Sequence, residues 1–183
     1  MKEKKQKAHG RSIPGFDLHE ALLNCNTYLE KCGGHSMAVG LSLKTKDFPK
    51  FKEEFEKYAE KCNICDIIPV IKLDDEISLK DINIKAVKEL NMLEPFGEAN
   101  KMPMFLCRNL KIQSIRTLSD GKHIKLILKD SGFYIDAIGF NLGYMAENYK
   151  IEDKVDICGT LEINEFNGRE TVQISLKDIR KSY

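Results

Sequence analysis

The sequence has few of the residues that mark several protein classes. It contains no Trp, only 5 Pro and only 12 Gly in 183 residues, which excludes collagen-like and low-complexity chains. No apolar run reaches the roughly 18 residues that span a bilayer, and residues 1–10 lack the apolar core of a signal peptide. The hydrophobic fraction of 42% suits one or two compact domains. We therefore expect a soluble, cytoplasmic protein without membrane contact.

An excess of one charge sign is also missing, since 29 basic residues balance 28 acidic ones for a net charge of +1. The distribution is uneven. Residues 1–11 carry five basic residues against one acidic residue, and residues 108–129 carry six against Asp120 alone. Such clustering allows a nearly neutral protein to present a basic surface, so the balance does not exclude a polyanionic partner.

The six cysteines show no complete metal-binding or disulfide pattern. Cys62 and Cys65 form a single CxxC, and neither a second pair nor paired His residues accompany it. We interpret the cysteines as thiols of a reducing compartment, with a redox or metal site as the less favoured alternative.

The first part of the chain mixes helical and strand patterns. Asp17 with Glu20 resembles a capping box, and apolar residues at helical spacing then predict a helix over 18–32 that Gly33 ends. Four further segments are predicted in the same way: a buried strand over 37–43, a helix over 47–62, a strand over 67–77 and a helix over 84–93.

From about Met104 the hydrophobic period changes from 3.6 to 2, which predicts strands. An interruption at Ser114 predicts a bulge, and a short helical piece is expected over 142–148. Hairpin signals stand at Asp120-Gly121, Ser131-Gly132 and Asn167-Gly168. Five strands with a helix after the third is the order of an OB-fold, a small barrel that often binds single strands or oligosaccharides.

Two short segments carry groups suited to phosphate. Gly33 and Gly34 lack Cβ atoms, so their main chain can approach a phosphate closely, and His35 can add a hydrogen bond. Arg11 offers bidentate donors and Ser12 a hydroxyl group. Each segment alone also suits an ordinary helix end or loop, so only their combination is informative.

Four segments in this order resemble the C-terminal half of the RecJ family: GRSIPGFDLHEAL, CGGHSMAVGL, LEPFGEAN and NEFNGRETVQISLKDIR. That family comprises single-strand-specific exonucleases that work in the 5′ to 3′ direction in DNA repair and recombination. The resemblance implies a mixed α+β fold with three parts. These are a truncated α/β DHH-associated domain over 1–80, a linker helix and loop over 81–103, and a five-stranded OB-fold β-barrel over 104–183.

The resemblance also implies functional residues. Phosphate binding would fall to Arg11, Ser12, Gly33, Gly34 and His35, which would face a catalytic DHH domain. The family hydrolyses phosphodiesters with two divalent metals, usually manganese, held by Asp and His side chains. This sequence has no DHH triplet and no carboxylate cluster suited to two ions about 3.5–4 Å apart. We therefore predict no catalytic or metal-binding residue here, and expect Mn²⁺ or Mg²⁺ in the DHH domain.

In the barrel, basic side chains are candidates for phosphate contacts and aromatic ones for base stacking. The basic candidates are Lys111, Arg116, Lys122, Lys125 and Lys129, and the aromatic ones are Phe133, Tyr134 and Phe166.

The family's DHH-associated domain begins upstream of the Gly-Arg-Ser motif, with strands for which residues 1–9 offer no counterpart. His9 also stands where the family has a small residue. We therefore expect a piece of a longer protein, inactive alone, whose partners are single-stranded DNA and the DHH domain of the same protein. An unpaired sheet edge would also allow self-association.

Two alternatives stay open at the level of sequence. One is a free-standing module that binds single-stranded nucleic acid through the barrel alone. The other is a phosphodiesterase of the wider DHH superfamily acting on short or cyclic nucleotides, or the related domain of alanyl-tRNA synthetase. These share a GGH-like element, but the EPFG segment and the OB-fold fit RecJ better.

Overall fold

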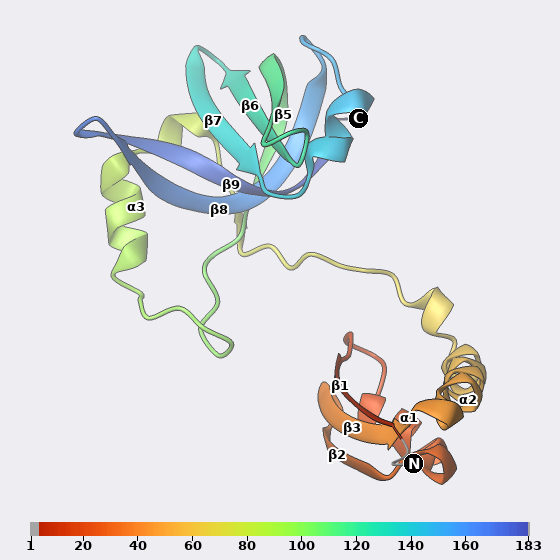
Figure 1. The fold of residues 1–183 in the computed structure, drawn as a ribbon. Helices are drawn as coiled ribbons and strands as arrows, with labels where there is room; N and C mark the ends of the chain where they lie inside the picture. The colour runs from red at the N-terminus through yellow and green to blue at the C-terminus, as the bar shows by residue number, and fades with distance from the viewer. Residues whose placement is uncertain (1–3, 183) are drawn as a thin grey trace. The chain divides into compact units, whose positions relative to one another are not determined.

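The structure is a computed structural model that describes residues 4–182, so Lys2 and Glu3 of the N-terminal basic run lie outside the described residues. The chain divides into two compact units, residues 1–70 and residues 71–183 (Figure 1). The longest helix among the described residues has 14 residues, and none is long and apolar enough to cross a membrane.

The first unit is a three-stranded antiparallel sheet with helices on one face. Its strands are β1 (Lys5–Arg11), β2 (Lys31–His35) and β3 (Ala38–Lys44), in the order β1-β3-β2, and its helices are α1 (Leu18–Asn24) and α2 (Phe48–Lys61). Val39 of β3 packs with Ala21 and Leu22 of α1, and Phe55 of α2 packs against this core. The apolar face of the sheet is thereby covered.

Three segments differ from the expectations from sequence. The first helix ends at Asn24 rather than near residue 32, because residues 31–35 pair with β3 and form β2 instead. Residues 5–11 form β1, although the resemblance predicted no strand there. Of the strand predicted over 67–77, only Asp75–Glu76 (β4) is a strand, because only these residues pair with a neighbour.

The second unit is a closed five-stranded barrel. Its strands are β5 (Phe105–Leu118), β6 (His123–Asp130), β7 (Phe133–Gly139), β8 (Lys154–Phe166) and β9 (Arg169–Lys181). The order β5-β6-β7-β9-β8 closes on itself because β8 also pairs with β5 (Figure 1). A short 3-10 helix, η5 (Gly143–Asn148), lies between β7 and β8. The predicted mixed α+β fold with an OB-like barrel is confirmed.

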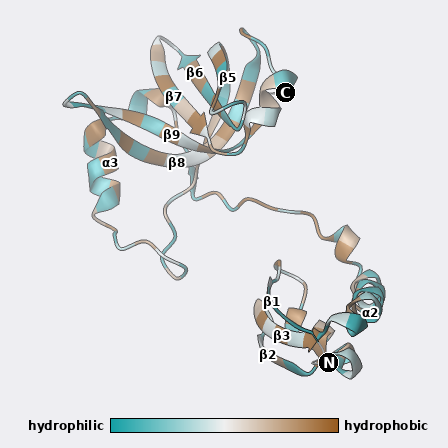
Figure 2. Cartoon of the chain, in the orientation of Figure 1, coloured by the Kyte–Doolittle hydropathy of each residue, from teal (hydrophilic) through white to brown (hydrophobic). Residues whose placement is uncertain are grey.

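Apolar side chains at alternate positions of the strands fill the interior of the barrel. Ile124, Leu126 and Leu128 of β6 are fully buried, and Figure 2 shows hydrophobic and hydrophilic bands alternating along the strands. The predicted bulge is present as a register shift between Ile112 and Ser114. The inward residues are therefore those that the period of 2 predicts.

The second unit contains one further helix, α3 (Ile84–Asn91), which packs on the barrel. Val87 of α3 is fully buried in the barrel core, and Leu90 packs against that core. Residues 81–103, which the resemblance assigned to a linker, therefore lie in the second compact unit, which begins at Ile71.

One buried carboxylate joins three strands of the barrel. Asp156 on β8 is only 5% exposed, and it accepts hydrogen bonds from the Asn109 N–H of β5 (3.0 Å), from the Arg180 guanidinium (3.1 Å) and from the Ser182 hydroxyl (2.7 Å). Burial alone would raise the pKa of Asp156, but the bonds from Ser182, Asn109 and Arg180 outweigh it and hold the pKa below its usual value. The carboxylate thus satisfies an N–H at an irregularity of the β5–β8 pairing.

We predict that Asp156→Asn destabilises the barrel by about 2–3 kcal/mol, because charged hydrogen bonds are lost in a buried place. Since the folded-state pKa is depressed, this stabilisation is present above the unfolded-state pKa of about 3.9 and is lost as pH falls through the folded-state value. The difference in the free energy of unfolding between wild type and Asp156→Asn should therefore shrink below about pH 4. Urea unfolding followed by amide NMR signals of β8 and β9 measures it, with the exposed Glu147→Gln as control. A difference that stays constant down to pH 3 would contradict the assignment.

Two neighbouring glycines provide a second, matched test. Gly34 has a φ of +143°, and a Cβ there would overlap the Ala38 carbonyl oxygen, whereas a Cβ at Gly33 would meet no atom within 4 Å. We predict that Gly34→Ala destabilises the first unit by about 1–3 kcal/mol, and that Gly33→Ala does not destabilise it. Urea unfolding of the amide signals of β2 and β3 distinguishes them. Equal stability of the two variants would show that the backbone at Gly34 is not constrained in this way.

Candidate nucleic-acid interface

Strand pairing brings together the two motifs that the sequence singled out in the first unit. Ala38 of β3 lies opposite Arg11 of β1 on one side and opposite His35 of β2 on the other. Directly opposed residues point to the same face of a sheet, so the guanidinium and the imidazole share the face that α1 and α2 leave uncovered. Two steps of about 4.8 Å between strands place their backbones roughly 10 Å apart, which is close enough for both side chains to reach one phosphate group.

The imidazole of His35 has a defined arrangement. The Met37 N–H points at Nδ1 of His35 at 3.4 Å. In the neutral ring an accepting Nδ1 leaves the proton on Nε2, which then acts as a donor. His35 is therefore suited to donate a hydrogen bond to an anion.

The hydroxyl of Ser12 already has an internal partner. It donates to the Phe16 carbonyl at 2.6 Å, and the Ser12 N–H donates to the Met37 carbonyl at 2.9 Å. In this arrangement Ser12 holds the loop that follows Arg11. Its predicted phosphate contact stays a prediction.

In the barrel, the pleat places most of the predicted contacts on one surface. We call it the outer barrel face, and it comprises the outward side chains of β5, β6 and β7. Lys111 lies opposite Lys129, Arg116 lies opposite Lys125, and Lys129 lies opposite Tyr134. Five of the eight predicted barrel residues therefore share this face.

Two of the cations on this face are neutralised by neighbours. Lys111 contacts Glu152 at 2.5 Å, and Lys125 contacts Asp136 at 2.5 Å. The hydrogen bond from Lys111 is the main cause that lowers the pKa of Glu152. Within residues 4–182, Arg116 has no ion-pair partner, so its charge is the one most available to a phosphate.

Lys129 and Tyr134 form a cation–π pair on the same face. The Lys129 Nζ lies 5.2 Å from the centre of the Tyr134 ring, and Tyr134 is 59% exposed. The ring is thus held by a neighbour while it stays open to solvent. This combination suits a stacking surface for a base.

Three predicted residues lie away from this group. Lys122 is in the turn before β6, and Phe166 is at the end of the β8–β9 hairpin, next to its turn. Phe133 lies two residues before the buried Ile135, so the pleat aims it to the inner side at the start of β7. The structure therefore does not bring these three to the outer barrel face.

Sequence reasoning missed apolar residues on the outer barrel face. Ile127 and Ile138 point outward between the basic residues, and Phe140 directly follows β7 with its ring 5.3 Å from that of His123. Phe140 is 58% exposed. The alternation of Lys125, Ile127 and Lys129 on β6 is the signal that could have identified this apolar strip.

The cysteines and the other potential metal ligands of the described residues form no cluster that could hold a metal ion. Within the described residues, no group of three or more His, Cys, Asp or Glu side chains could hold a metal ion. All six cysteines are free thiols, and burial raises the pKa of the Cys107 thiol to about 12. Cys107 therefore packs in the core as a neutral side chain.

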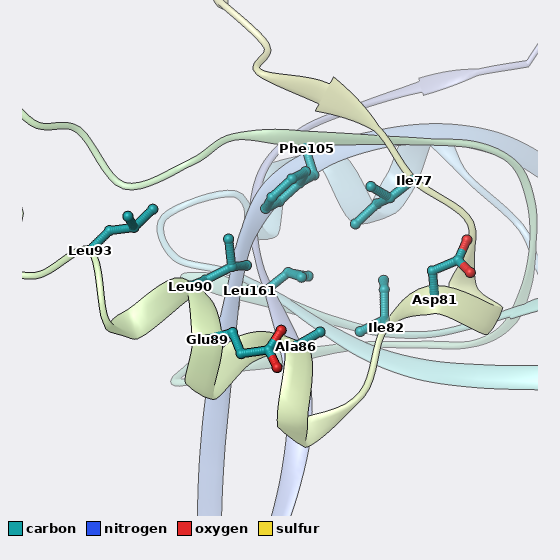
Figure 3. Close-up of a pocket in the computed structure, with 9 residues that line it drawn as sticks. All are labelled: Ile77, Asp81, Ile82, Ala86, Glu89, Leu90, Leu93, Phe105 and Leu161. Atoms are coloured by element: carbon teal, nitrogen blue, oxygen red, sulfur yellow. The ribbon is translucent and has the colours of Figure 1, made fainter.

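A pocket of about 340 Å³ lies between α3 and the barrel (Figure 3). Ile77, Ile82 and Leu90 line it with Phe105 and Leu161, and its charged members are the acids Asp81 and Glu89. An apolar pocket with acidic neighbours does not suit a phosphodiester strand. We therefore assign the interface to the two basic surfaces.

Comparisons with known proteins identify the family of this chain. The family model described as RecJ OB domain matches residues 73–178. A single-stranded-DNA-specific exonuclease RecJ from Bacillus subtilis is 34% identical over 174 residues, which is 94% of this chain and 22% of that protein. The RecJ of Thermus thermophilus is 29% identical over 171 residues, 93% of this chain and 24% of that protein.

A solved structure is similar to this chain over nearly its whole length. The crystal structure of Thermus thermophilus RecJ in complex with Mn²⁺ matches with a TM-score of 0.75 and 28% identity, covering 97% of this chain and 26% of that one. A second structure of the same protein, with Mg²⁺, matches with a TM-score of 0.73. The chain thus spans about a quarter of the RecJ proteins it matches. Because the family model covers more than half of its residues, the chain belongs to the RecJ family.

Proposed function

We propose that this chain is the substrate-binding part of a RecJ-like 5′ to 3′ exonuclease of DNA repair and recombination, acting in the cytoplasm. In this role it binds the backbone of single-stranded DNA and guides the strand to a DHH catalytic domain of the same protein. The relatives that support this are named single-stranded-DNA-specific exonucleases. The observation that carries the proposal is the convergence of Arg11 and His35 on one open face of the sheet.

The two surfaces have different tasks in this proposal. Arg11 and His35 hold a phosphate near the catalytic domain, with Gly33, Gly34 and Ser12 shaping the backbone around it. The outer barrel face contacts the strand further along, through the unpaired charge of Arg116 and the held ring of Tyr134. Lys111 and Lys125 contribute less, because carboxylates already neutralise them.

Divalent metal would act outside these residues. Thermus RecJ has been crystallised with Mn²⁺ and with Mg²⁺. The residues described here offer no donor set that fits either ion. Metal-dependent catalysis and both metal ions therefore belong to the DHH domain in this proposal.

Self-association through a sheet edge stays a prediction. β1 forms one edge of the first sheet, and Lys5, Lys7 and Arg11 lie along it. Like charges along an edge oppose pairing with a second copy.

We predict that the chain binds dT15, and that two variants weaken binding for separate reasons. Arg116→Gln should reduce the dependence of log affinity on log salt by about 0.7, the value for one phosphate contact on a single strand. Tyr134→Ala should cost about 1–3 kcal/mol through lost stacking, and Phe166→Ala less, because Phe166 lies outside the outer barrel face. Fluorescence anisotropy at several salt concentrations measures both effects.

The exposed Lys150→Gln is the matched control for the charge change. An Arg116→Gln effect equal to that of the control would argue against the outer barrel face as a binding surface.

The second candidate is a module in which the barrel binds alone, and the separate closed core of the second unit favours it. The same titration separates the two. In the first proposal, the double variant Arg11→Gln, His35→Ala loses affinity for dT15. If the barrel acts alone, that variant binds as wild type does.

We also predict that the purified chain leaves end-labelled dT15 uncut, even with Mn²⁺. Its sequence contains no DHH triplet, and its described residues contain no cluster of side chains that could hold a metal ion. Gel analysis over several hours tests this. Metal-dependent cleavage that co-purifies with the chain through a further chromatographic step would overturn it.

A further inference from the structure

The open face of the first sheet carries more basic groups than the two motifs contain. Alternation from Arg11 places His9, Lys7 and Lys5 of β1 on that face, and alternation from His35 places Lys31 of β2 there. One carboxylate, Glu30, precedes β2 and pairs with Lys5 at 2.9 Å. Two rows of basic side chains thus border the central strand.

Between its first residue, Ala38, and Ser42, the central strand presents small side chains to the same face, and Lys44 stands on that face at the end of the strand. Ala38, Gly40 and Ser42 of β3 alternate there, and Gly33 of β2 lies opposite Gly40. A hollow of about 310 Å³ lies over this floor, and Lys7, His9 and Lys31 are among the residues that line it. The face therefore has the form of a channel, which we call the β3 channel.

The fold itself does not demand glycine at the centre of this floor. Neither Gly33 nor Gly40 has a positive φ, and Gly33 has open space where a Cβ would be. A Cβ at Gly40 would come no closer than 3.7 Å to the His9 ring, which is an ordinary contact. Glycine inside a strand weakens it, and it often marks a place where a ligand approaches the backbone.

We propose that the β3 channel binds a second stretch of the phosphodiester backbone of a single strand, between Lys7 and Lys31, next to the phosphate held by Arg11 and His35. Lys7 and Arg11 are four positions apart on β1, or about 13 Å along the channel. The bare floor of Gly33 and Gly40 lets the strand lie against the sheet while cations flank it. This inference rests on the proposed function and adds Lys7, Lys31 and Gly40 to its site.

The test is the affinity of the whole chain for dT15 as a function of salt. The double variant Lys7→Gln, Lys31→Gln should reduce the slope of log affinity against log salt by about 1.4, the value for two phosphate contacts. The matched control is Lys50→Gln, Lys61→Gln, which removes two exposed charges from α2 and should leave the slope nearly unchanged. Equal slopes for the two double variants would overturn the proposal.

A second variant tests the shape of the channel with every charge retained. Gly40→Val fills the floor with a side chain that strands favour, so the first unit should keep its amide NMR spectrum while binding of dT15 weakens. If a folded Gly40→Val binds dT15 with wild-type affinity, the basic residues attract the strand by charge alone and the strand does not lie against the sheet. That result would also overturn the proposal. Failure of the wild-type chain to bind dT15 would instead refute the proposed function.

Discussion

The pairing of β3 with β1 on one side and β2 on the other is the constraint on which the first unit depends. It sets Arg11, Ala38 and His35 in one row, although Arg11 and His35, the two proposed phosphate ligands, are 24 positions apart in the sequence. The same register turns Val39 toward α1 and the core. A slip of one residue would move the basic side chains to the core face and the apolar ones to solvent, so core packing enforces the arrangement of the proposed phosphate-binding face.

The barrel uses the same principle with a different outcome. Its inward residues form one apolar core, while the outward positions of β5, β6 and β7 collect basic, aromatic and aliphatic side chains. Carboxylates from β7 and from the loop before β8 neutralise Lys111 and Lys125, whereas among the described residues Arg116 and Lys129 form no ion pair with a carboxylate. Net charge is therefore a poor guide to the binding surface, because local pairing decides which cations remain available.

Much of the fold could be predicted from local patterns in the sequence. The period of 2 after Met104, the hairpin signals and the bulge near Ser114 appear in the structure where they were predicted, because alternation and turn chemistry act over a few residues. The helix over 18–32 was wrong beyond Asn24. The helical spacing of apolar residues continues to Cys32, but pairing with β3 makes residues 31–35 a strand.

The sequence by itself determined the family, through four ordered motifs, and it determined which residue types could bind a phosphodiester strand. The tertiary structure alone decided which of them lie on one surface. It joined Arg11 to His35, exposed the row from Lys7 to Arg11 along a floor of small residues, and separated Phe133 and Phe166 from the outer barrel face. The physical reason is that strand register and ion pairing join residues distant along the chain, whereas periodicity and turn signals describe only neighbours.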